Sequence, residues 1–540
     1  MQVTCTELNN KNKLNKMYRA HEEPIISYFE YDPFGDFKHR LEDLKKRTYQ
    51  RESLADVLTK MNANWGAANS SLEQIERLKQ SDSVAVVGGQ QAGLLTGPLY
   101  SINKLISIVH LAKQQEKELN VPVIPVFWIA GEDHDFDEIN HVYSDRQNRA
   151  YKHKLDEESS VKKSISDMTL NHDNVKEWLT HFLRDLEETS YTNEWFGDTL
   201  DALQKSNTYT DFFARLIFQL FPEQGIVLLD AHAKEIRELE TAYFLQMIEH
   251  HEEIHQSTYK TLQTLQQEGF DIPLDIEEGE TNLFYHGEAN DRVLLKYIDG
   301  EWIGKHEEVR FSTEEMKEIA GQHPEKLSNN VVTRPLMQEL LLPTLAFVAG
   351  DGEINYWATL KKAFQVLDVQ MPPVVPRLSF TYVTNRVQKL MKKRVVEAED
   401  IIRHGAGSKK VQWLTNQTTA PLNVLFEEVK TSMADVHAPL QTYAKSISPD
   451  LEQLAQQNQQ YIEQQVQFLK DRIDQHLEMK YQHQISQFDE LELFLRPRQT
   501  LQERIWSPYT FINSYGYQFL RDLMEKESLD FRKEHFIVHL

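Results

Sequence analysis

Apolar residues in the first part of the chain alternate between short unbroken runs and longer segments with helical spacing. The run Ser83–Gly89, SVAVVGG, is rich in β-branched residues and ends in glycines, which is typical of a buried strand. From Leu99 to Leu119 apolar residues recur three and four positions apart, which predicts a helix that starts just after Pro98. A further apolar run, VPVIPVFWIAG, predicts the next strand. Together they predict a parallel strand–helix–strand unit.

The same order of strand and helix recurs from Gly225 and from Leu342, and MPPVVPR from Met371 indicates one more strand. Strands that alternate with helices predict an α/β fold with a Rossmann-like parallel sheet, assembled from non-contiguous pieces. Two insertions separate the pieces. One is helical and charged, and the other contains a predicted hairpin, RVLLKYIDGEWIG, that turns at Asp299-Gly300.

After about residue 380 the sequence becomes rich in Gln, Glu and Lys with helical spacing. A stripe of apolar residues predicts a helical hairpin or coiled coil: Ile462, Val466, Leu469, Ile473, Leu477, Tyr481, Ile485 and Phe488. Its partner is the preceding helices near 380–402 and 422–444, a second copy of the chain, or both.

The resulting division follows these changes in pattern. The predicted segments are 1–150 (first part of the core), 151–215 (helical insertion), 216–264 (second part of the core), 265–330 (small α+β insertion), 331–380 (third part of the core), 381–500 (helical coiled-coil domain for dimerisation) and 501–540 (return to the core).

Charge and composition restrict the classes of partner. Acidic residues outnumber basic ones by 83 to 59, so the averaged field repels phosphate backbones and anionic lipid, and we expect neither nucleic acid nor membrane as a partner. The single cysteine, Cys5, excludes an internal disulfide. The longest apolar runs fall short of the ~20 residues of a membrane helix, and no signal peptide is recognised at the start. We therefore expect a cytoplasmic protein.

The glycine-rich string GGQQAGLLTGP joins the first predicted strand to its helix. Backbone N–H groups near glycines and at a helix N-terminus suit a phosphate or carboxylate, whereas the alternative is a purely structural turn. Candidate anion-binding residues here are Gly89, Gln90, Gln91, Gly93, Thr96, Gly97 and Asn103. Lys104 lies beside them and is assigned to catalysis, together with Asp133, His134 and Asp135 of the next loop.

A second string, AGEDHDFDEIN, follows the next strand, close to where open α/β sheets bind ligands. Glu132, Asp133, His134 and Asp135 could hold a cation, an amine or a sugar hydroxyl, with His134 or Asp135 as a general base. Asp137 and Glu138 also suit the first turn of a helix. The spacing matches no known metal motif, so we assign no metal ligand and leave a divalent-metal requirement open.

A third glycine turn, AGDGEINYW, offers Glu353, Tyr356 and Trp357 as pocket residues, although half-buried aromatics are the commoner outcome. Arginines suit carboxylates and phosphates, and ordinary salt bridges are the alternative. We assign Arg334 to the substrate, and the remaining arginines to a nucleotide: Arg377, Arg496, Arg498 and Arg504.

Several strings in order along the chain resemble the cysteine-adding enzymes of bacillithiol biosynthesis, the BshC family: GGQQAGLLTGPLYSINK, VFWIAGEDHDFDEIN, SNNVVTRPLMQE, LPTLAFVAGDGEINYW, PRLSFT and LQERIWSPYTFINSYG. The resemblance implies a core related to class I aminoacyl-tRNA synthetases with two connecting-peptide insertions, and a coiled-coil homodimer. It also implies a ligase that joins cysteine to the amine of glucosaminyl-malate. Carboxyl activation by ATP or ADP is the expectation that goes with it.

The chain departs from the synthetases in two places. The position of their H-x-G-H motif holds GGQQAGLLTG, and no K-M-S-K-S-like loop is present. Two other functions stay open at this point. One is an ATP-dependent ligase or nucleotidyltransferase for another small acid, and the other is a coiled-coil scaffold with a nucleotide-sensing core.

Overall fold

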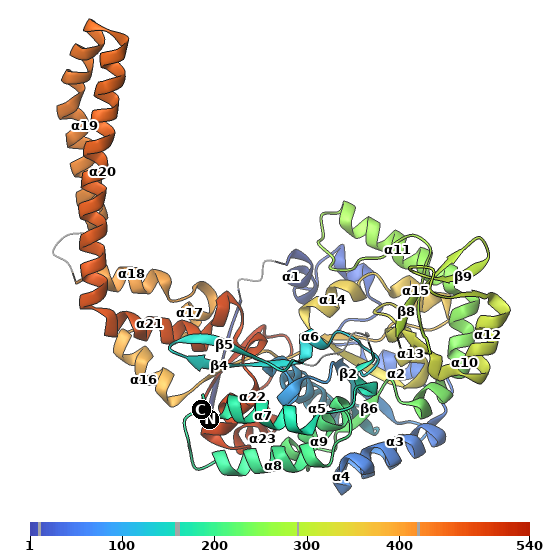
Figure 1. The fold of residues 1–540 in the computed structure, drawn as a ribbon. Coiled ribbons are helices and arrows are strands. Elements are labelled where there is room, and N and C mark those ends of the chain that lie inside the picture. The colour runs from blue at the N-terminus through green and yellow to red at the C-terminus, as the bar shows by residue number, and fades with distance from the viewer. Residues whose placement is uncertain (9–11, 157–162, 289–290, 418–421) are drawn as a thin grey trace. The chain divides into compact units, whose positions relative to one another are not determined.

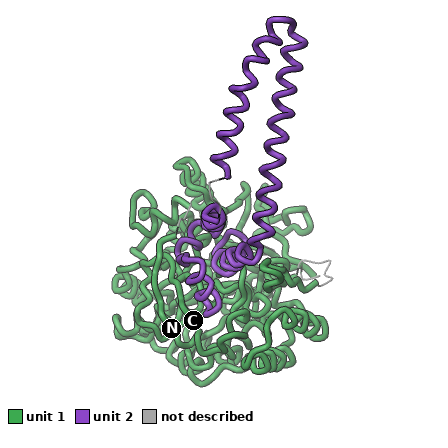
Figure 2. The backbone as a smooth tube through the Cα atoms, turned by 90° about the vertical axis from the view of Figure 1, so that its left-hand side faces the viewer, with its two compact units in different colours: residues 1–382, 502–540 green, residues 383–501 purple. Residues whose placement is uncertain are grey.

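The computed structural model describes residues 1–540 except 9–11, 157–162, 289–290 and 418–421. The described chain divides into two compact units (Figure 2). Unit 1 comprises residues 1–382 and 502–540, and unit 2 comprises residues 383–501. Within the described residues, no helix is both long enough and apolar enough to cross a membrane.

Unit 1 is built on a parallel sheet with the strand order β13-β12-β2-β3-β6 (Figure 1). Its strands are β2 (Val84–Gln90), β3 (Val123–Ile129), β6 (Val227–Asp230), β12 (Thr344–Ala349) and β13 (Val374–Pro376). All residues of β3, β6 and β12 are buried, which explains why these strands are continuous apolar runs in the sequence. The parallel sheet confirms the predicted α/β class.

Helices cover both faces of this sheet. On one face Leu58 and Ile75 pack in a single core with Val87 and Val126. On the other face, the helix that connects β2 to β3 lies very close to the sheet. A Cβ atom at Gly88 would overlap a side chain of that helix. The helices before and between these strands are α1 (Lys13–Arg19), η1 (Ile25–Tyr28), α2 (Phe37–Leu44), α3 (Arg51–Trp65), α4 (Asn69–Leu78), η2 (Leu94–Thr96) and α5 (Leu99–Leu119).

The first insertion lies between β3 and β6. Its elements are α6 (Phe136–Ile139), β4 (His141–Arg146), β5 (Arg149–Lys154), η3 (Ile165–Asp167), α7 (His172–Leu183), α8 (Thr192–Gln204) and α9 (Tyr209–Leu220). It is mostly helical, as predicted, but β4 and β5 form an antiparallel hairpin that the sequence analysis did not predict.

The second insertion lies between β6 and β12 and carries an antiparallel sheet with the order β10-β9-β8-β7-β11. β8 and β9 are the predicted hairpin, and both turn residues, Asp299 and Gly300, have the positive φ of a tight turn. Its elements are α10 (Lys234–Glu249), α11 (His251–Gln267), β7 (Glu280–His286), β8 (Arg292–Ile298), β9 (Glu301–Gly304), β10 (Arg310–Ser312), α12 (Thr313–Gln322), η4 (Pro324–Lys326), β11 (Leu327–Asn329) and α13 (Thr333–Leu341).

The end of the chain returns to unit 1, where β15 pairs antiparallel with β1, so the two chain ends lie side by side (Figures 1 and 2). The remaining elements of this unit are β1 (Gln2–Thr6), α14 (Asp351–Trp357), α15 (Lys361–Val366), η6 (Gln502–Arg504), α22 (Pro508–Tyr515), α23 (Gln518–Met524) and β15 (His535–His539), and β14 (Phe380–Val383) runs to the boundary with unit 2.

Unit 2 is helical and is dominated by a long antiparallel pair, α19 and α20 (Figure 2). His437 and Asn458 bond across the pair at 3.0 Å. The predicted apolar stripe is not one helix, because the helix breaks at Tyr481. The elements are α16 (Asn385–Arg394), α17 (Ala398–His404), α18 (Gly407–Thr415), α19 (Leu422–Ile447), α20 (Pro449–Lys480), α21 (Gln482–Leu495) and η5 (Pro497–Gln499).

Candidate active site at the strand ends

The candidate site lies where the central strands of unit 1 end. Because β2, β3, β6 and β12 are parallel, their carboxyl ends meet at one edge of the sheet. The glycine loop after β2 and the acidic loop after β3 leave this edge next to each other, and Gln91 Nε2 donates to Asp133 Oδ2 across 2.6 Å. The two sequence motifs therefore contribute to one site.

The glycine loop has a fixed and strained backbone. A Cβ at Gly93 would lie 2.7 Å from Gly97 Cα, so a larger residue does not fit there. Leu95 and Thr96 have φ values of 47° and 64°, a left-handed conformation that branched residues rarely adopt. Strain of this kind persists only where the surrounding structure enforces it, and it is common at functional sites.

The N-terminus of α5 is closed off by the end of the chain. The first helical N–H group, that of Leu99, donates to the Trp506 carbonyl at 2.8 Å, and the Ser101 N–H bonds Pro98 O at 3.0 Å. Thr96, with Gly93 and Gly97, is buried. This corrects the expectation that an anion sits on this helix N-terminus, because the protein itself uses these donors.

Lys104 is also committed to internal contacts. Its ammonium group donates to Gly89 O at 2.7 Å, to Gln90 Oε1 at 3.1 Å and to Glu353 Oε2 at 2.6 Å. The side chain is only 2% exposed, and burial lowers the pKa of Lys104 while Glu353 opposes that shift. Lys104 thus joins the end of β2 to α14 instead of reaching a substrate, which corrects its predicted role.

Arg377 and Asn103 both contact a buried carboxylate from the end of the chain, Glu503. Arg377 Nη1 donates to Glu503 Oε2 at 2.8 Å, and Asn103 Nδ2 donates to the same oxygen at 2.7 Å. Burial alone would raise the pKa of Glu503, but Arg377 and its other partners hold it at about 2. Arg377 and Asn103 both use these donors on Glu503, so in this structure the donors are not free for a ligand.

The other arginines assigned to a nucleotide are divided between the two units. Arg504 is exposed on η6 of unit 1, whereas Arg496 and Arg498 belong to unit 2. In unit 2, Arg496 Nη1 donates to the carbonyl of Arg403 at 3.3 Å.

The acidic loop presents its first residues to the site and its last ones to solvent. Asp133 Oδ1 accepts the N–H groups of His134 at 2.7 Å and of Asp135 at 3.4 Å. Arg292, from β8 of the second insertion, lies 3.8 Å from Asp133 Oδ1 and 3.4 Å from His134 Nδ1. Asp137 occupies the first turn of α6, as the helix-dipole alternative predicted.

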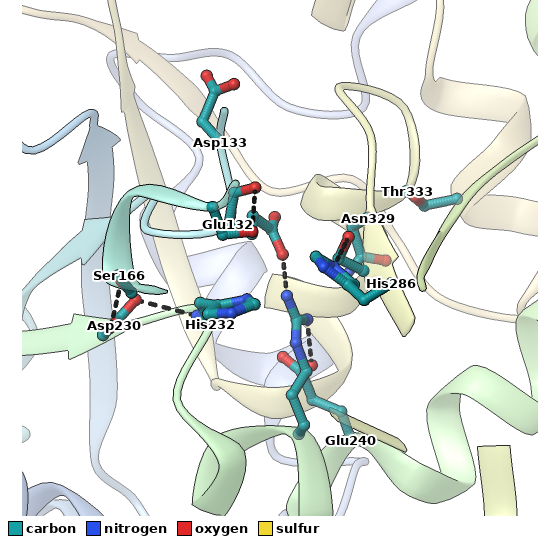
Figure 3. A network of polar contacts seen from close by, with 12 residues as sticks. Glu132, Asp133, Ser166, Asp230, His232, Glu240, His286, Asn329 and Thr333 are labelled. Carbon is teal, nitrogen blue, oxygen red and sulfur yellow. Dashed lines mark hydrogen bonds and ion pairs between the residues drawn. The ribbon is translucent and has the colours of Figure 1, made fainter. Parts of the chain in front are cut away.

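Gly131 is the point where this loop meets the first insertion and β6. A Cβ at Gly131 would overlap both Ser166 Oγ and the Asp230 carboxylate. Ser166 Oγ donates to Asp230 Oδ2 at 2.7 Å, and its N–H donates to Gly131 O at 3.0 Å (Figure 3). Glycine is therefore required here by close approach.

Glu132 does not face a substrate, because it is buried against Arg237 of α10. Arg237 also donates to Glu240 Oε2 at 2.7 Å, so one buried guanidinium serves two carboxylates (Figure 3). Burial raises the pKa of Glu240 to about 7; Arg237 opposes the shift and Glu132 adds to it. The predicted substrate contact at Glu132 is corrected to a buried ion pair.

Arg334, on α13, keeps a guanidinium near the third glycine turn. It donates to Gln338 Oε1 at 3.2 Å and to the Tyr356 hydroxyl at 3.3 Å. Trp357, in contrast, is fully buried and stacks on Phe347 with ring centroids 4.4 Å apart. Trp357 therefore belongs to the hydrophobic core, and its predicted pocket role is corrected.

The structure adds polar residues that the sequence analysis missed, all from elements distant in the chain: Ser166, Asp167, Asp230, His232, Arg237, Glu240, His286, Arg292 and Asn329. Asp230 ends β6 and His232 comes two residues later, so the rule that ligands bind at strand ends could have found them. The others carry no local signal. Among the residues that the structure describes, no group of His, Cys, Asp or Glu is arranged to hold a metal ion.

A Rossmann-like parallel sheet with a polar site outside its strand ends is typical of α/β enzymes, which bind small polar substrates at that edge. Two family models together match nearly the whole chain: "Bacillithiol biosynthesis BshC, N-terminal Rossmann-like domain" over residues 1–378, and "Bacillithiol biosynthesis BshC, C-terminal coiled-coil domain" over residues 380–540. The chain therefore belongs to the BshC family of bacillithiol biosynthesis, which confirms the resemblance seen in the sequence.

Curated relatives agree over their full length. The chain is 42% identical over 544 residues to a protein of Oceanobacillus iheyensis, covering 100% of both chains. It is 38% identical over 541 residues to a protein of Bacillus licheniformis, again covering 100% of both. Each of these relatives is named "Putative cysteine ligase BshC".

The first prediction concerns the close approach at Gly131. Replacing it with alanine forces Ser166 and Asp230 apart, so Gly131→Ala should lower the free energy of unfolding by about 1–3 kcal/mol. Gly197→Ala is the matched control, because a Cβ there has nothing within 4 Å and should stabilise α8 by about 0.5–1 kcal/mol. Urea denaturation of both variants measures this. Equal stability of the two variants would contradict the assignment.

The second prediction concerns the pH dependence that Glu240 adds. Its pKa in the folded protein, about 7, exceeds the ordinary 4.5, so the folded state holds this proton more tightly. The stabilisation is complete below pH 4.5 and is lost as pH rises to about 7, a change of about 3 kcal/mol. Glu240→Gln removes this term. The unfolding free energy of the variant should therefore gain about 3 kcal/mol relative to wild type between pH 4.5 and 7.5; a constant difference would refute the assignment.

Proposed function

We propose that this protein is a ligase that joins L-cysteine, through an amide bond, to the amino group of glucosaminyl-malate, the last step of bacillithiol biosynthesis. The observation that carries the proposal is the match to the BshC family along nearly the whole chain, with relatives named as cysteine ligases. The strand-end site supports it, because the site combines carboxylates for an amine with a guanidinium for a carboxylate.

For the amine we assign Asp133 and its neighbours in the acidic loop. Asp133 is 32% exposed, its carboxylate lies beside Gln91, and backbone N–H groups hold the loop in place. An ammonium group that approaches this carboxylate gains a charge-assisted hydrogen bond.

For the malate carboxylates we assign Arg334. It donates to two neutral oxygens, and none of the described carboxylates forms an ion pair with it. A carboxylate ligand would supply the bidentate partner that arginine favours.

Amide formation from a free carboxylate in water is uphill, so we propose that a nucleotide, ATP or ADP, takes part in activating the carboxyl group. Of the arginines that we assigned to it, Arg504 is the exposed one in unit 1. We propose that Arg504 holds a phosphate group of this nucleotide, and we place the reaction in the cytoplasm.

We further propose that the protein is a homodimer through α19 and α20. These helices expose apolar side chains along much of their length, which a monomer leaves in water: Leu425 (45%), Val436 (77%), Leu440 (61%), Tyr443 (70%), Leu454 (59%), Tyr461 (64%) and Phe468 (55%). A second copy of the same pair would cover an apolar face of this size.

The third prediction tests the strand-end site. Asp133→Asn removes the carboxylate next to Gln91 and Arg292, so formation of the cysteine adduct should fall about 10- to 100-fold, the value of one charged hydrogen bond. Mass spectrometry of reactions with cysteine, ATP and glucosaminyl-malate measures the product. Asp137→Asn is the matched control in the same loop, because Asp137 is 77% exposed and pairs with Lys154. Equal losses in the two variants would count against the site.

The fourth prediction tests the dimer. Leu440→Glu combined with Tyr443→Glu puts two charges on the exposed face of α19, which should weaken self-association at least about 100-fold. Light scattering at several protein concentrations measures the molar mass. Val411→Glu on α18 is the control, since Val411 is as exposed, at 60%, but lies outside the pair. A wild-type protein that is monomeric at all concentrations would refute the proposal.

A further inference from the structure

His232 and Asp167 form a partly buried pair next to the acidic loop. His232 follows β6, and its Nε2 lies 2.9 Å from Asp167 Oδ2. Asp167 ends η3, which the acidic loop holds through the Ile165 N–H on Asp133 O at 2.8 Å and Ser164 Oγ on Glu132 O at 3.1 Å. The pair is therefore fixed to the same loop that we assign to the substrate amine.

The carboxylate of Asp167 sets the state of the imidazole ring. A carboxylate only accepts, so His232 Nε2 carries the proton and the neutral ring has its lone pair on Nδ1. That nitrogen is buried and has no hydrogen-bond partner among the residues that the structure describes. A buried acceptor without a hydrogen-bond partner is unfavourable for stability, so this nitrogen is more than a packing element of the core.

A second imidazole lies next to the first. The ring centroids of His232 and His286 are 5.1 Å apart, and Nδ1 of His286 is likewise buried without a partner in the described chain (Figure 3). Burial, with the charges of Arg237 and Arg292 nearby, lowers the pKa of His286 to about 2, so this ring stays neutral. Two neighbouring imidazoles thus each have a buried Nδ1 without a partner among the described residues.

Charged groups lie on several sides of His232. Asp167 accepts from its ring, and Asp230 Oδ1 accepts from its backbone N–H at 3.0 Å. Arg237, which also faces Asp230, is neutralised by Glu132 and Glu240.

We propose that His232 is the general base of the ligation and that Asp167 is its positioning residue; this rests on the proposed function. In the step, the amine nitrogen of the acceptor attacks the carbonyl carbon of an activated acyl donor, a mixed anhydride with phosphate. The C–N bond forms, the C–O bond to phosphate breaks, and phosphate leaves with the electron pair. The proton lost by the nitrogen passes to Nδ1 of His232.

This assignment replaces the two bases that the sequence suggested. His134 Nδ1 already lies 3.4 Å from Arg292 Nη1, and Asp135 is exposed to water. A buried imidazole whose tautomer a carboxylate fixes matches the requirements of a base better than either.

Two variants and a control test the proposal. His232→Gln keeps a donor for Asp167 but removes the Nδ1 lone pair, and Asp167→Asn no longer fixes the tautomer. Each should lower kcat for the cysteine adduct by about 10²- to 10⁴-fold, with KM changed less than about threefold. His153→Gln is the matched control: it makes the same change in another His–Asp pair, that of His153 with Asp185 at 2.7 Å, on the β4–β5 hairpin. It should keep wild-type kcat.

Two further readouts separate a base from a merely structural histidine. The limb of the pH–rate profile that reports this imidazole should vanish in His232→Gln, and added imidazole should restore part of the activity of His232→Ala. A folded His232→Gln with kcat within threefold of wild type, or with an unchanged pH profile and no rescue of His232→Ala, overturns the base assignment alone. A wild-type protein that makes no adduct overturns the proposed function and this inference with it.

Discussion

The site depends on one close approach, that of the Gly131 backbone to Ser166 and Asp230. Because residue 131 has no side chain, the loop after β3, the end of β6 and the short helix η3 meet at van der Waals distance. The same contact sets the position of Asp133 on one side and of Asp167 on the other. A loop one carbon atom further out would separate the residues that we assign to the amine from the imidazole that we assign as its base.

Buried charge arranges the rest of unit 1 around this point. Arg237 is shared by Glu132 and Glu240, and Lys104 joins β2 to Glu353 on α14. A third buried pair, Arg377 with Glu503, connects the end of the chain to this frame. Removing one partner of such a pair strongly destabilises the fold, because the other charge is left buried and unpaired. Several polar residues that the sequence suggests for substrate binding thus form internal ion pairs instead. The residues left for substrates are fewer and more exposed.

The strands and the helix between them followed from periodicity, since an all-buried parallel strand is a continuous apolar run. The acidic loop could also be placed, because it follows such a run. Lys104 and Trp357 show what pattern alone cannot decide: a cation near a glycine loop and an aromatic after a glycine turn look the same whether they face a ligand or the core. Burial decides this, and it arises from tertiary contacts that the local pattern does not show, such as Glu353 on Lys104 and Phe347 on Trp357. His286 could not be predicted, because it reaches His232 only through the packing of the second insertion beside β6.

The central claim is that the strand-end edge of unit 1 binds the acceptor whose amine is ligated. A crystal structure of the protein with glucosaminyl-malate tests it most directly. The account predicts malate carboxylates on Arg334 and the sugar amine within hydrogen-bond distance of Asp133, with His232 Nδ1 close to that amine. Density for the substrate elsewhere, on the helices of unit 2 or away from the ends of β2, β3 and β6, would contradict it.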